Sequence, residues 1–170
     1  MALVFRPARA DELQQAEELV VRSINDLIER HGFGPMATLR PPDFQLFCLK
    51  DDPDGLWVAE ADGEIVGFAL SWVCGDLWFL AELFVAPGHQ GCGIGNELLA
   101  RTFEHARKAG ATNESLITFT FNRVARIVYS ARPVSAAANL FPQRRKGRTD
   151  EPPARRDASL HANRTDILAS

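Results

Sequence analysis

Three glycines spaced two residues apart form the most distinctive chemical feature of the chain. Gly91, Gly93 and Gly95 lie in the segment Gln90 to Asn96, between an apolar run and an amphipathic stretch. A glycine-rich turn that leads from a strand into a helix presents backbone N–H groups without intrahelical partners, and the helix dipole favours negative charge there. We therefore predict that the main-chain amides of this loop hold phosphate.

A carboxylate, Glu82, interrupts the apolar run from Leu77 to Val85. An acidic side chain is rare in such a run unless it is paired, faces solvent or has a function. Burial would raise its pKa toward the range that a general base needs, so Glu82 is our candidate base. Asp76 at the preceding turn is a weaker candidate, and the alternative reading is that Glu82 alternates outward into solvent.

The spacing of the glycines excludes two common phosphate-binding loops. A dinucleotide-binding loop needs G-x-G-x-x-G, and a P-loop ends in Gly-Lys-Ser/Thr, whereas this loop follows G-x-G-x-G. The remaining pattern, Gln90-x-x-Gly93-x-Gly95 after a strand with Pro87 two residues beyond it, resembles the acetyl-CoA loop of the GNAT superfamily of N-acetyltransferases. The resemblance extends over roughly residues 3–129.

This resemblance implies that acetyl-CoA is the co-substrate and that its pantetheine arm pairs with the strand before the loop. The implied cofactor-binding residues are Leu83, Phe84, Val85, Gln90, Gly91, Cys92, Gly93, Ile94, Gly95, Asn96 and Asn122. Cys92 would contribute its backbone only. The resemblance also implies that an acid at the position of Glu82 takes the proton of the amine, usually through water.

A second motif, Asn122-x-x-Ala125-x-x-x-Tyr129, is similar to the Asn-x-x-Ala-x-x-x-Tyr signature of the family. It implies that the Tyr129 hydroxyl protonates the departing thiolate and that Asn122 contacts the cofactor. Tyr129 is the only tyrosine in the chain. The alternative is that its ring packs on the core with the hydroxyl at the surface.

Composition predicts a soluble, single-domain cytoplasmic protein. The 170 residues are 46% apolar and 24% charged, and no apolar run approaches the roughly 20 residues that a membrane span requires. The N-terminus lacks the basic-then-apolar layout of a signal peptide. Cys48, Cys74 and Cys92 are odd in number and lack metal-like spacing, so we expect reduced thiols and no metal site.

Charge is divided unevenly along the chain. Residues 1–141 carry a net charge of −6, and residues 142–170 carry a net charge of +3. The acidic main part of the chain suits a cationic amine substrate better than a nucleic acid. The basic clusters at 144–148 and 155–156 have no interleaved aromatic residue for base stacking, so we do not expect a nucleic-acid partner. Residues 142–170 also have few large apolar side chains, which predicts disorder there, and we extend this expectation to the whole tail at 131–170.

The periodicity of the chain predicts an α/β fold. We expect a strand at 3–6, a helix at 11–29 with Asp11 as N-cap and Gln14 completing a capping box, and a short helix at 43–50. Phe44, Phe47 and Cys48 would share one face of that short helix. Strands at 56–60, 64–74 and 77–86 form an antiparallel meander, with a hairpin turn at Asp62-Gly63.

The glycine loop would lead into a helix that presents Leu99, Phe103 and Ala106 to the sheet, and a strand at 115–121 would follow in parallel orientation. A further helix would start at Asn122. The predicted fold is therefore a GNAT-like mixed, mostly antiparallel central sheet flanked by helices.

The chain departs from the family after Tyr129. Family members continue with Tyr-x-x-x-Gly-Phe, but this chain has Pro133 and Val134, and the C-terminal strands are missing or altered. The codons permit Gly-Phe in a frame two bases on, so we hypothesise a frameshift from about residue 130. We accordingly divide the chain into a GNAT-like domain at 1–130 and an atypical tail at 131–170.

The leading functional hypothesis is transfer of an acetyl group from acetyl-CoA directly to a primary amine. A catalytically impaired acyl-CoA-binding or regulatory domain is the runner-up, and a nucleic-acid-binding tail is the third. The acceptor is a small molecule or a peptide that the sequence does not identify. By analogy of position, the acceptor site is bordered by a loop that contains Phe33, Met36 and Arg40. The alternative is that these side chains pack on the core. The resemblance also makes a homodimer through sheet edges an expectation.

Overall fold

A computed structural model describes residues 2–118, 135 and 136 of the chain. They form one six-stranded sheet, with the strands in chain order across it. The first four strands pair antiparallel, whereas β5 runs parallel to β4 and β6 parallel to β5. The strands are β1 (Leu3–Pro7), β2 (Leu56–Ala61), β3 (Glu64–Cys74), β4 (Leu77–Val85), β5 (Asn113–Leu116) and β6 (Ser135–Ala136). The predicted α/β fold with a mostly antiparallel sheet is confirmed.

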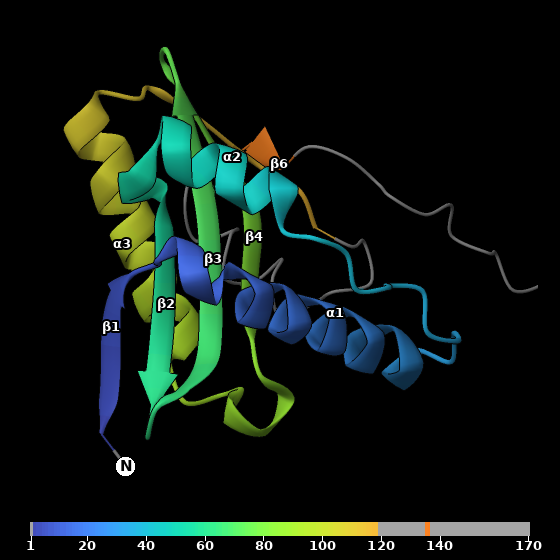
Figure 1. Cartoon of the computed structure of the whole chain (residues 1–170). Helices are drawn as coiled ribbons and strands as arrows, with labels where there is room; N and C mark the ends of the chain where they lie inside the picture. Colours follow the sequence, from blue (N-terminus) through green and yellow to red (C-terminus); the bar gives the residue numbers. More distant parts are fainter. Residues whose placement is uncertain (1, 119–134, 137–170) are drawn as a thin grey trace, which may run out of the picture.

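Helices cover both faces of the sheet (Figure 1). The helices α1 (Leu13–Arg30) and α2 (Asp43–Asp51) lie on one face, and α3 (Ile94–Ala109) lies on the other. Short 3-10 turns occupy Ala10–Glu12, Pro53–Gly55 and Pro87–His89. No helix in the described part of the chain is long and apolar enough to cross a membrane.

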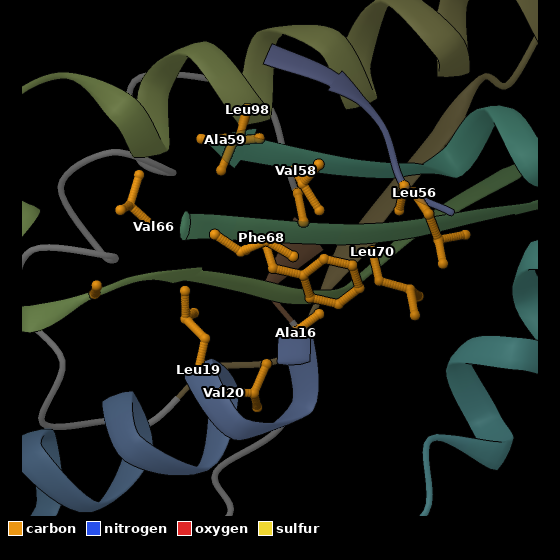
Figure 2. Close-up of a cluster of buried hydrophobic side chains, with 14 of the residues drawn as sticks. Ala16, Leu19, Val20, Leu56, Val58, Ala59, Val66, Phe68, Leu70 and Leu98 are labelled. Atoms are coloured by element: carbon orange, nitrogen blue, oxygen red, sulfur yellow. The ribbon is translucent and has the colours of Figure 1, made fainter. Parts of the chain in front are cut away.

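The main core lies between β2, β3 and the two long helices (Figure 2). Leu19 and Val20 of α1 approach one face of the sheet, where Phe68 and Leu70 of β3 are fully buried. Leu98 of α3 packs on the opposite face. A second cluster joins α3 to the ends of β4 and β5, and it contains Trp78, Leu80, Leu99, Ala106 and Leu116. The predicted sheet-facing side of α3 is therefore confirmed.

The predicted turns are confirmed as well. Asp62 and Gly63 have φ values of +52° and +86°, and a type I′ hairpin turn requires positive φ at both positions. Gly110 adopts φ +79° at the end of α3, as a left-handed helix cap does. Cys48, Cys74 and Cys92 are free thiols.

The predicted start of the first helix is wrong. Asp11 is not the N-cap, because the chain enters α1 through the 3-10 turn and Glu12 precedes the first α-helical residue. The Glu12 carboxylate accepts a hydrogen bond from the backbone N–H of Arg9 at 2.8 Å. Gln14 therefore completes no capping box, and Glu12 satisfies a backbone donor at the start of the helix.

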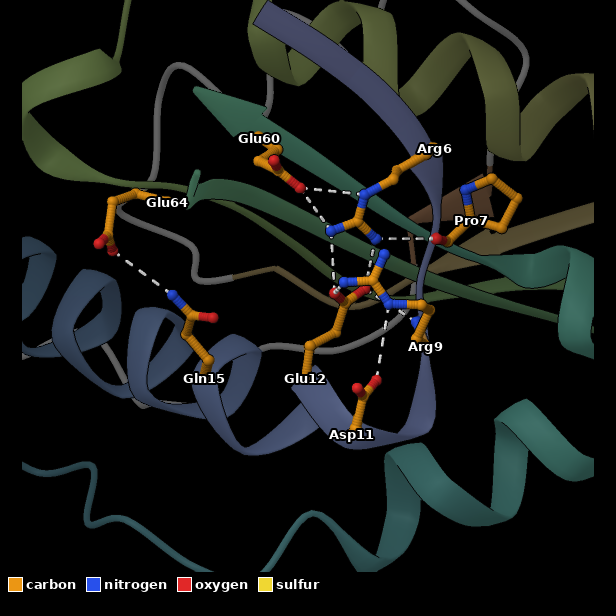
Figure 3. A network of polar contacts seen from close by, with 8 residues as sticks. All are labelled: Arg6, Pro7, Arg9, Asp11, Glu12, Gln15, Glu60 and Glu64. Atoms are coloured by element: carbon orange, nitrogen blue, oxygen red, sulfur yellow. Dashed lines mark hydrogen bonds and ion pairs between the residues drawn. The ribbon is translucent and has the colours of Figure 1, made fainter. Parts of the chain in front are cut away.

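Glu12 also belongs to a polar network that joins β1, β2 and the 3-10 turn before α1 (Figure 3). The Arg6 guanidinium donates to both Glu12 oxygens, at 2.6 and 2.9 Å, and to Glu60 at 2.6 Å. Burial pushes the pKa of Glu12 up, but the hydrogen bonds from Arg6 and from the Arg9 N–H hold that pKa below its ordinary value. The network is therefore an ionised one.

Two further expectations need correction. On α2, Phe44 and Phe47 are exposed and only Cys48 of the predicted face is buried, because Gln45 shares the inward side with it. β5 covers Asn113–Leu116, so it begins and ends earlier than the predicted strand at 115–121. Within the tail predicted to be disordered, Ser135 and Ala136 form β6 beside β5, so the expectation of disorder fails at these two residues. The predictions for Asn122, Tyr129, the altered Gly-Phe position and the rest of the tail lie outside the described residues.

Candidate active site

The position of Glu82 depends on a β-bulge in β4. Leu70 of β3 pairs with Glu82, but the next residue, Ser71, pairs with Leu80, so Ala81 is an extra residue without a partner. Strand side chains alternate between faces, and a bulge shifts that alternation by one residue. Leu80 consequently lies in the cluster under α3, whereas Glu82 lies on the face that α1 and α2 cover.

Glu82 is half-buried there and is held by a side chain of α2. The Gln45 Nε2 donates to Glu82 Oε1 at 3.1 Å and to Glu17 Oε2 of α1 at 2.8 Å. Gln45 itself is only 5% exposed. The alternative that Glu82 points outward into solvent is therefore excluded, because its carboxylate turns toward the helices and contacts the buried Gln45 of α2.

The surroundings of Glu82 favour its protonated form. Burial first, and then the nearby charge of Glu17, raise its pKa from 4.5 to about 7, against the hydrogen bond from Gln45. A carboxylate with a pKa near neutrality is half ionised at pH 7, so it can both accept and return a proton. The pKa of Glu17 is raised in turn, mainly by burial.

The bulge also marks the point at which β4 loses its second neighbour. β5 pairs with β4 only from Leu77 to Leu80, and no described strand pairs with that edge from Ala81 to Val85. The open edge therefore contains the predicted cofactor-binding residues Leu83, Phe84 and Val85. Backbone N–H and C=O groups along such an edge are available to an extended ligand, although the Val85 carbonyl already accepts from Gln90 Nε2 and Ser23 Oγ.

β4 leads through a 3-10 turn into the glycine loop and α3. Gly91 and Gly93 have φ values of +81° and +83°, a left-handed conformation that other residues rarely adopt. Gly93 is the N-cap of α3, so the N–H groups of Ile94, Gly95 and Asn96 have no intrahelical partner. Gly91, Cys92, Gly93 and Asn96 are exposed. This end of α3 is thus a donor-rich, electropositive turn.

The Gln90 side chain fastens this loop to its surroundings. Its Nε2 donates to the Val85 carbonyl at 3.1 Å, and its Oε1 accepts from Arg30 at the end of α1, at 3.4 Å. Gln90 therefore connects the last residue of β4 with α1. Among the predicted loop residues, Gln90 contributes a structural side chain as well as its backbone.

Two other acids lie far from this region. Asp76, the weaker candidate base, is exposed at the β3–β4 turn, where its main-chain carbonyl accepts from the backbone N–H groups of Thr112 and Asn113 at 2.9 Å each. Its carboxylate accepts from the Asn113 side chain at 2.6 Å. Glu114 of β5 pairs with Trp78, near that same end of β4. Asp76 lies six positions before Glu82 along the extended chain, a span of roughly 20 Å. The structure therefore gives Asp76 a turn-stabilising position.

The loop between α1 and α2 borders the same face of the sheet. Asn25 of α1 fixes it, because its Oδ1 accepts from the N–H groups of Met36 and Ala37 at 3.0 and 2.9 Å. Phe33 and Met36 are 54% and 53% exposed. The alternative that these two side chains pack on the core is therefore wrong.

Sequence reasoning missed three residues of this region. Glu17 and Gln45 are ordinary polar residues of two different helices, and only the fold brings them to Glu82. Gly67 of β3 had a local signal, since it is an isolated glycine in a strand. A Cβ at Gly67 would lie 2.9 Å from side-chain atoms of both Ile94 and Leu98, so the glycine permits α3 to begin close to the sheet.

Comparison with known proteins agrees with this geometry. The family described as acetyltransferase (GNAT) matches residues 21–132. An uncharacterized N-acetyltransferase of Archaeoglobus fulgidus is 35% identical over 138 residues, which cover 75% of this chain and 90% of that protein.

Solved structures share the fold at lower sequence identity. The PaiA N-acetyltransferase of Thermoplasma acidophilum in complex with coenzyme A is 16% identical, with a TM-score of 0.63, over 77% of this chain and 88% of that one. The ribosomal-protein-S18-alanine N-acetyltransferase of Escherichia coli is 17% identical, with a TM-score of 0.59, over 76% of each chain. The chain therefore belongs to the GNAT family of acetyltransferases and is an acyltransferase.

Proposed function

We propose that this acyltransferase moves the acetyl group of acetyl-CoA directly to a primary amine and that Glu82 is its general base. The observation that carries the proposal is a half-buried carboxylate with a pKa of about 7, beside the open edge of β4. An acid of this kind can take the proton of an ammonium near neutral pH. The relative from Archaeoglobus fulgidus, named an N-acetyltransferase, supports an amine acceptor.

The residues near Glu82 fit a thioester co-substrate. The left-handed Gly91 and Gly93 and the first N–H groups of α3 offer donors to a diphosphate, and the edge from Ala81 to Val85 offers partners to an extended amide-containing arm. Acetyl-CoA supplies an activated acyl carbon with a thiolate leaving group. The chain would place that carbon beside the strand that carries Glu82.

The proposed reaction forms one bond and breaks one. Glu82 removes a proton from the ammonium, directly or through water, and the amine nitrogen bonds to the acyl carbon. The carbon–sulfur bond breaks, and the thiolate takes a proton from Tyr129 by the resemblance already described. The nitrogen loses its second proton as the amide forms, and this proton restores the Tyr129 hydroxyl, whereas the proton on Glu82 passes to solvent. The products are an N-acetyl amide and coenzyme A. The acceptor is a small molecule or a peptide with a primary amine.

A thiol-release assay tests this proposal. The full chain is supplied with acetyl-CoA and a panel containing a polyamine, an amino sugar, free amino acids and a peptide with an unblocked N-terminus. Glu82→Gln should lower the rate with the responsive amine by roughly 100-fold or more, as expected for loss of a general base. Asp76→Asn, at the other end of β4, should leave the rate unchanged. An undiminished rate in Glu82→Gln would contradict the proposal.

A further inference from the structure

A single buried amide links two carboxylates on the α1–α2 face of the sheet. Gln45 Nε2 lies 2.8 Å from Glu17 Oε2 and 3.1 Å from Glu82 Oε1, with Glu82 Oε2 at 3.4 Å. When Glu17 and Glu82 are ionised they only accept hydrogen bonds, so in that state both contacts require the nitrogen of the amide and not its oxygen. The orientation of the Gln45 side chain is therefore fixed by the chemistry of its two partners.

We propose that Gln45, anchored by Glu17, is the positioning residue of Glu82, and that Glu17 is the second carboxylate that keeps this base ready to accept a proton. The inference rests on the proposed function, because it presupposes that Glu82 is the base. Neither Gln45 nor Glu17 needs to touch the acetyl group or the amine. Both act through the carboxylate of Glu82.

The geometry supports a positioning role for Gln45. The shorter bond, to Glu17, anchors the amide to α1, so the second N–H of Gln45 is directed at Glu82 from a fixed place. Each carboxylate oxygen has two lone pairs, and Gln45 occupies a small part of this capacity. The remaining lone pairs of Glu82 stay available for the proton of an amine or of a bridging water.

The two partners act on Glu82 in opposite directions. The negative charge of Glu17 raises the pKa of Glu82, whereas the hydrogen bond from Gln45 lowers it. Cys48, on the same inward side of α2, has a pKa raised to about 11, first by burial and then by the charge of Glu82, so its thiol is neutral near pH 7. Arg40 acts on Glu17, whose pKa it lowers. Glu17 is therefore the charged partner of the base among the described residues.

The pH dependence of kcat/KM separates these two effects. For the wild-type chain, kcat/KM should rise with pH through about 7, because only ionised Glu82 accepts a proton. Glu17→Gln removes a like charge and should move this rise to lower pH by roughly 0.5–1 unit. Gln45→Met removes the hydrogen bond to the charged form and should move it to higher pH by a similar, roughly 0.5–1 unit, amount.

Glu18→Gln is the matched control, because Glu18 is the exposed neighbour of Glu17 on the same helix. This variant should leave the profile at its wild-type position. A purely structural role for Gln45 or Glu17 would lower the rate at every pH without moving the rise. Glu17→Gln retains the size and polarity of the side chain, so it tests the inference even if Gln45→Met does not fold.

Glu82→Gln distinguishes failure of this inference from failure of the proposed function. If Glu82→Gln keeps the wild-type rise near pH 7, Glu82 is not the base and the proposed function is wrong. Suppose instead that Glu82→Gln abolishes the rise of kcat/KM, whereas Glu17→Gln and folded Gln45→Met show the rise at the wild-type pH. Glu82 is then the base, but the positioning role of Gln45 and Glu17 is overturned. Opposite displacements in the two variants are the result that we expect.

Discussion

Gly67 of β3 lies directly against Ile94 of α3, so close that a Cβ on Gly67 would come within 2.9 Å of Ile94 Cγ2. The same Cβ would also lie 2.9 Å from Leu98 Cδ1 and 3.1 Å from the Cβ of Ala59. The first turn of α3 therefore approaches the sheet at a position where any other side chain would displace it. This contact sets the place of the donor-rich turn relative to the end of β4.

Gly67→Ala should destabilise the fold and weaken acetyl-CoA binding together. Overpacking of a tight site lowers the free energy of unfolding by about 1–3 kcal/mol, and displacement of α3 moves the loop amides. Denaturant unfolding and the KM for acetyl-CoA measure the two effects. Gly88→Ala is the control, since a Cβ at Gly88 meets nothing within 4 Å. Equal stability of the two variants would show that the contact is not a constraint.

Gly93→Ala should raise the KM for acetyl-CoA by roughly tenfold, because the loop amides would no longer align with the diphosphate. The left-handed φ of +83° also costs about 1 kcal/mol of stability with alanine. Gly75, at the β3–β4 turn, has a positive φ too, and a Cβ added there would meet nothing within 4 Å. Gly75→Ala should therefore lose similar stability at an unchanged KM, and a matching rise in its KM would argue against a role for the loop.

Arg6→Met should lower the free energy of unfolding by about 3 kcal/mol at pH 7, because it leaves the buried carboxylate of Glu12 without its main partner. The pKa of Glu12 in the folded state is held below its ordinary 4.5. The stabilisation by the Arg6–Glu12 interaction is therefore present above pH 4.5 and is lost as the pH falls through the pKa of Glu12 in the folded state. Denaturant unfolding at pH 7 and pH 3 measures the difference. Arg9→Met, at an exposed guanidinium, should cost less than about 1 kcal/mol.

Glu82→Gln should stabilise the protein at alkaline pH. The folded pKa of about 7 exceeds the ordinary 4.5, so the folded state binds more protons between these values, and the wild-type stability falls as the pH rises through that interval. Removal of the charge should recover on the order of 2 kcal/mol at pH 8 and little at pH 4. Thermal unfolding across this range tests it, and a pH-independent difference would contradict the raised pKa.

Much of the site could be predicted because its signals are local. The glycine spacing and the apolar strand before it indicate a phosphate-binding turn, and Gly91 and Gly93 indeed adopt the left-handed conformation. Asp62-Gly63 likewise specifies its hairpin. Glu82 stands out as a candidate because an acid inside an apolar run is unusual in any context.

The remaining features depend on contacts between distant segments. The bulge at Ala81 arises from the pairing of β3 with β4, and a smooth alternation would have placed Glu82 under α3 with Leu80. The start of α1 differs from the capping box predicted for Asp11 and Gln14, because Arg6 on the strand β1 binds Glu12. The link from Glu17 through Gln45 has no local signature, since it spans two helices and a strand.

Calorimetric titration of the folded, full-length chain with acetyl-CoA tests most directly whether the loop between β4 and α3 holds the co-substrate. We predict one saturable site per chain, competition by coenzyme A, and weaker binding in Gly93→Ala but not in Gly75→Ala. Titrations at two temperatures are needed, because binding produces no heat at a temperature where its enthalpy happens to be zero. Absence of heat at both temperatures, from protein that unfolds cooperatively in the same buffer, would contradict the account.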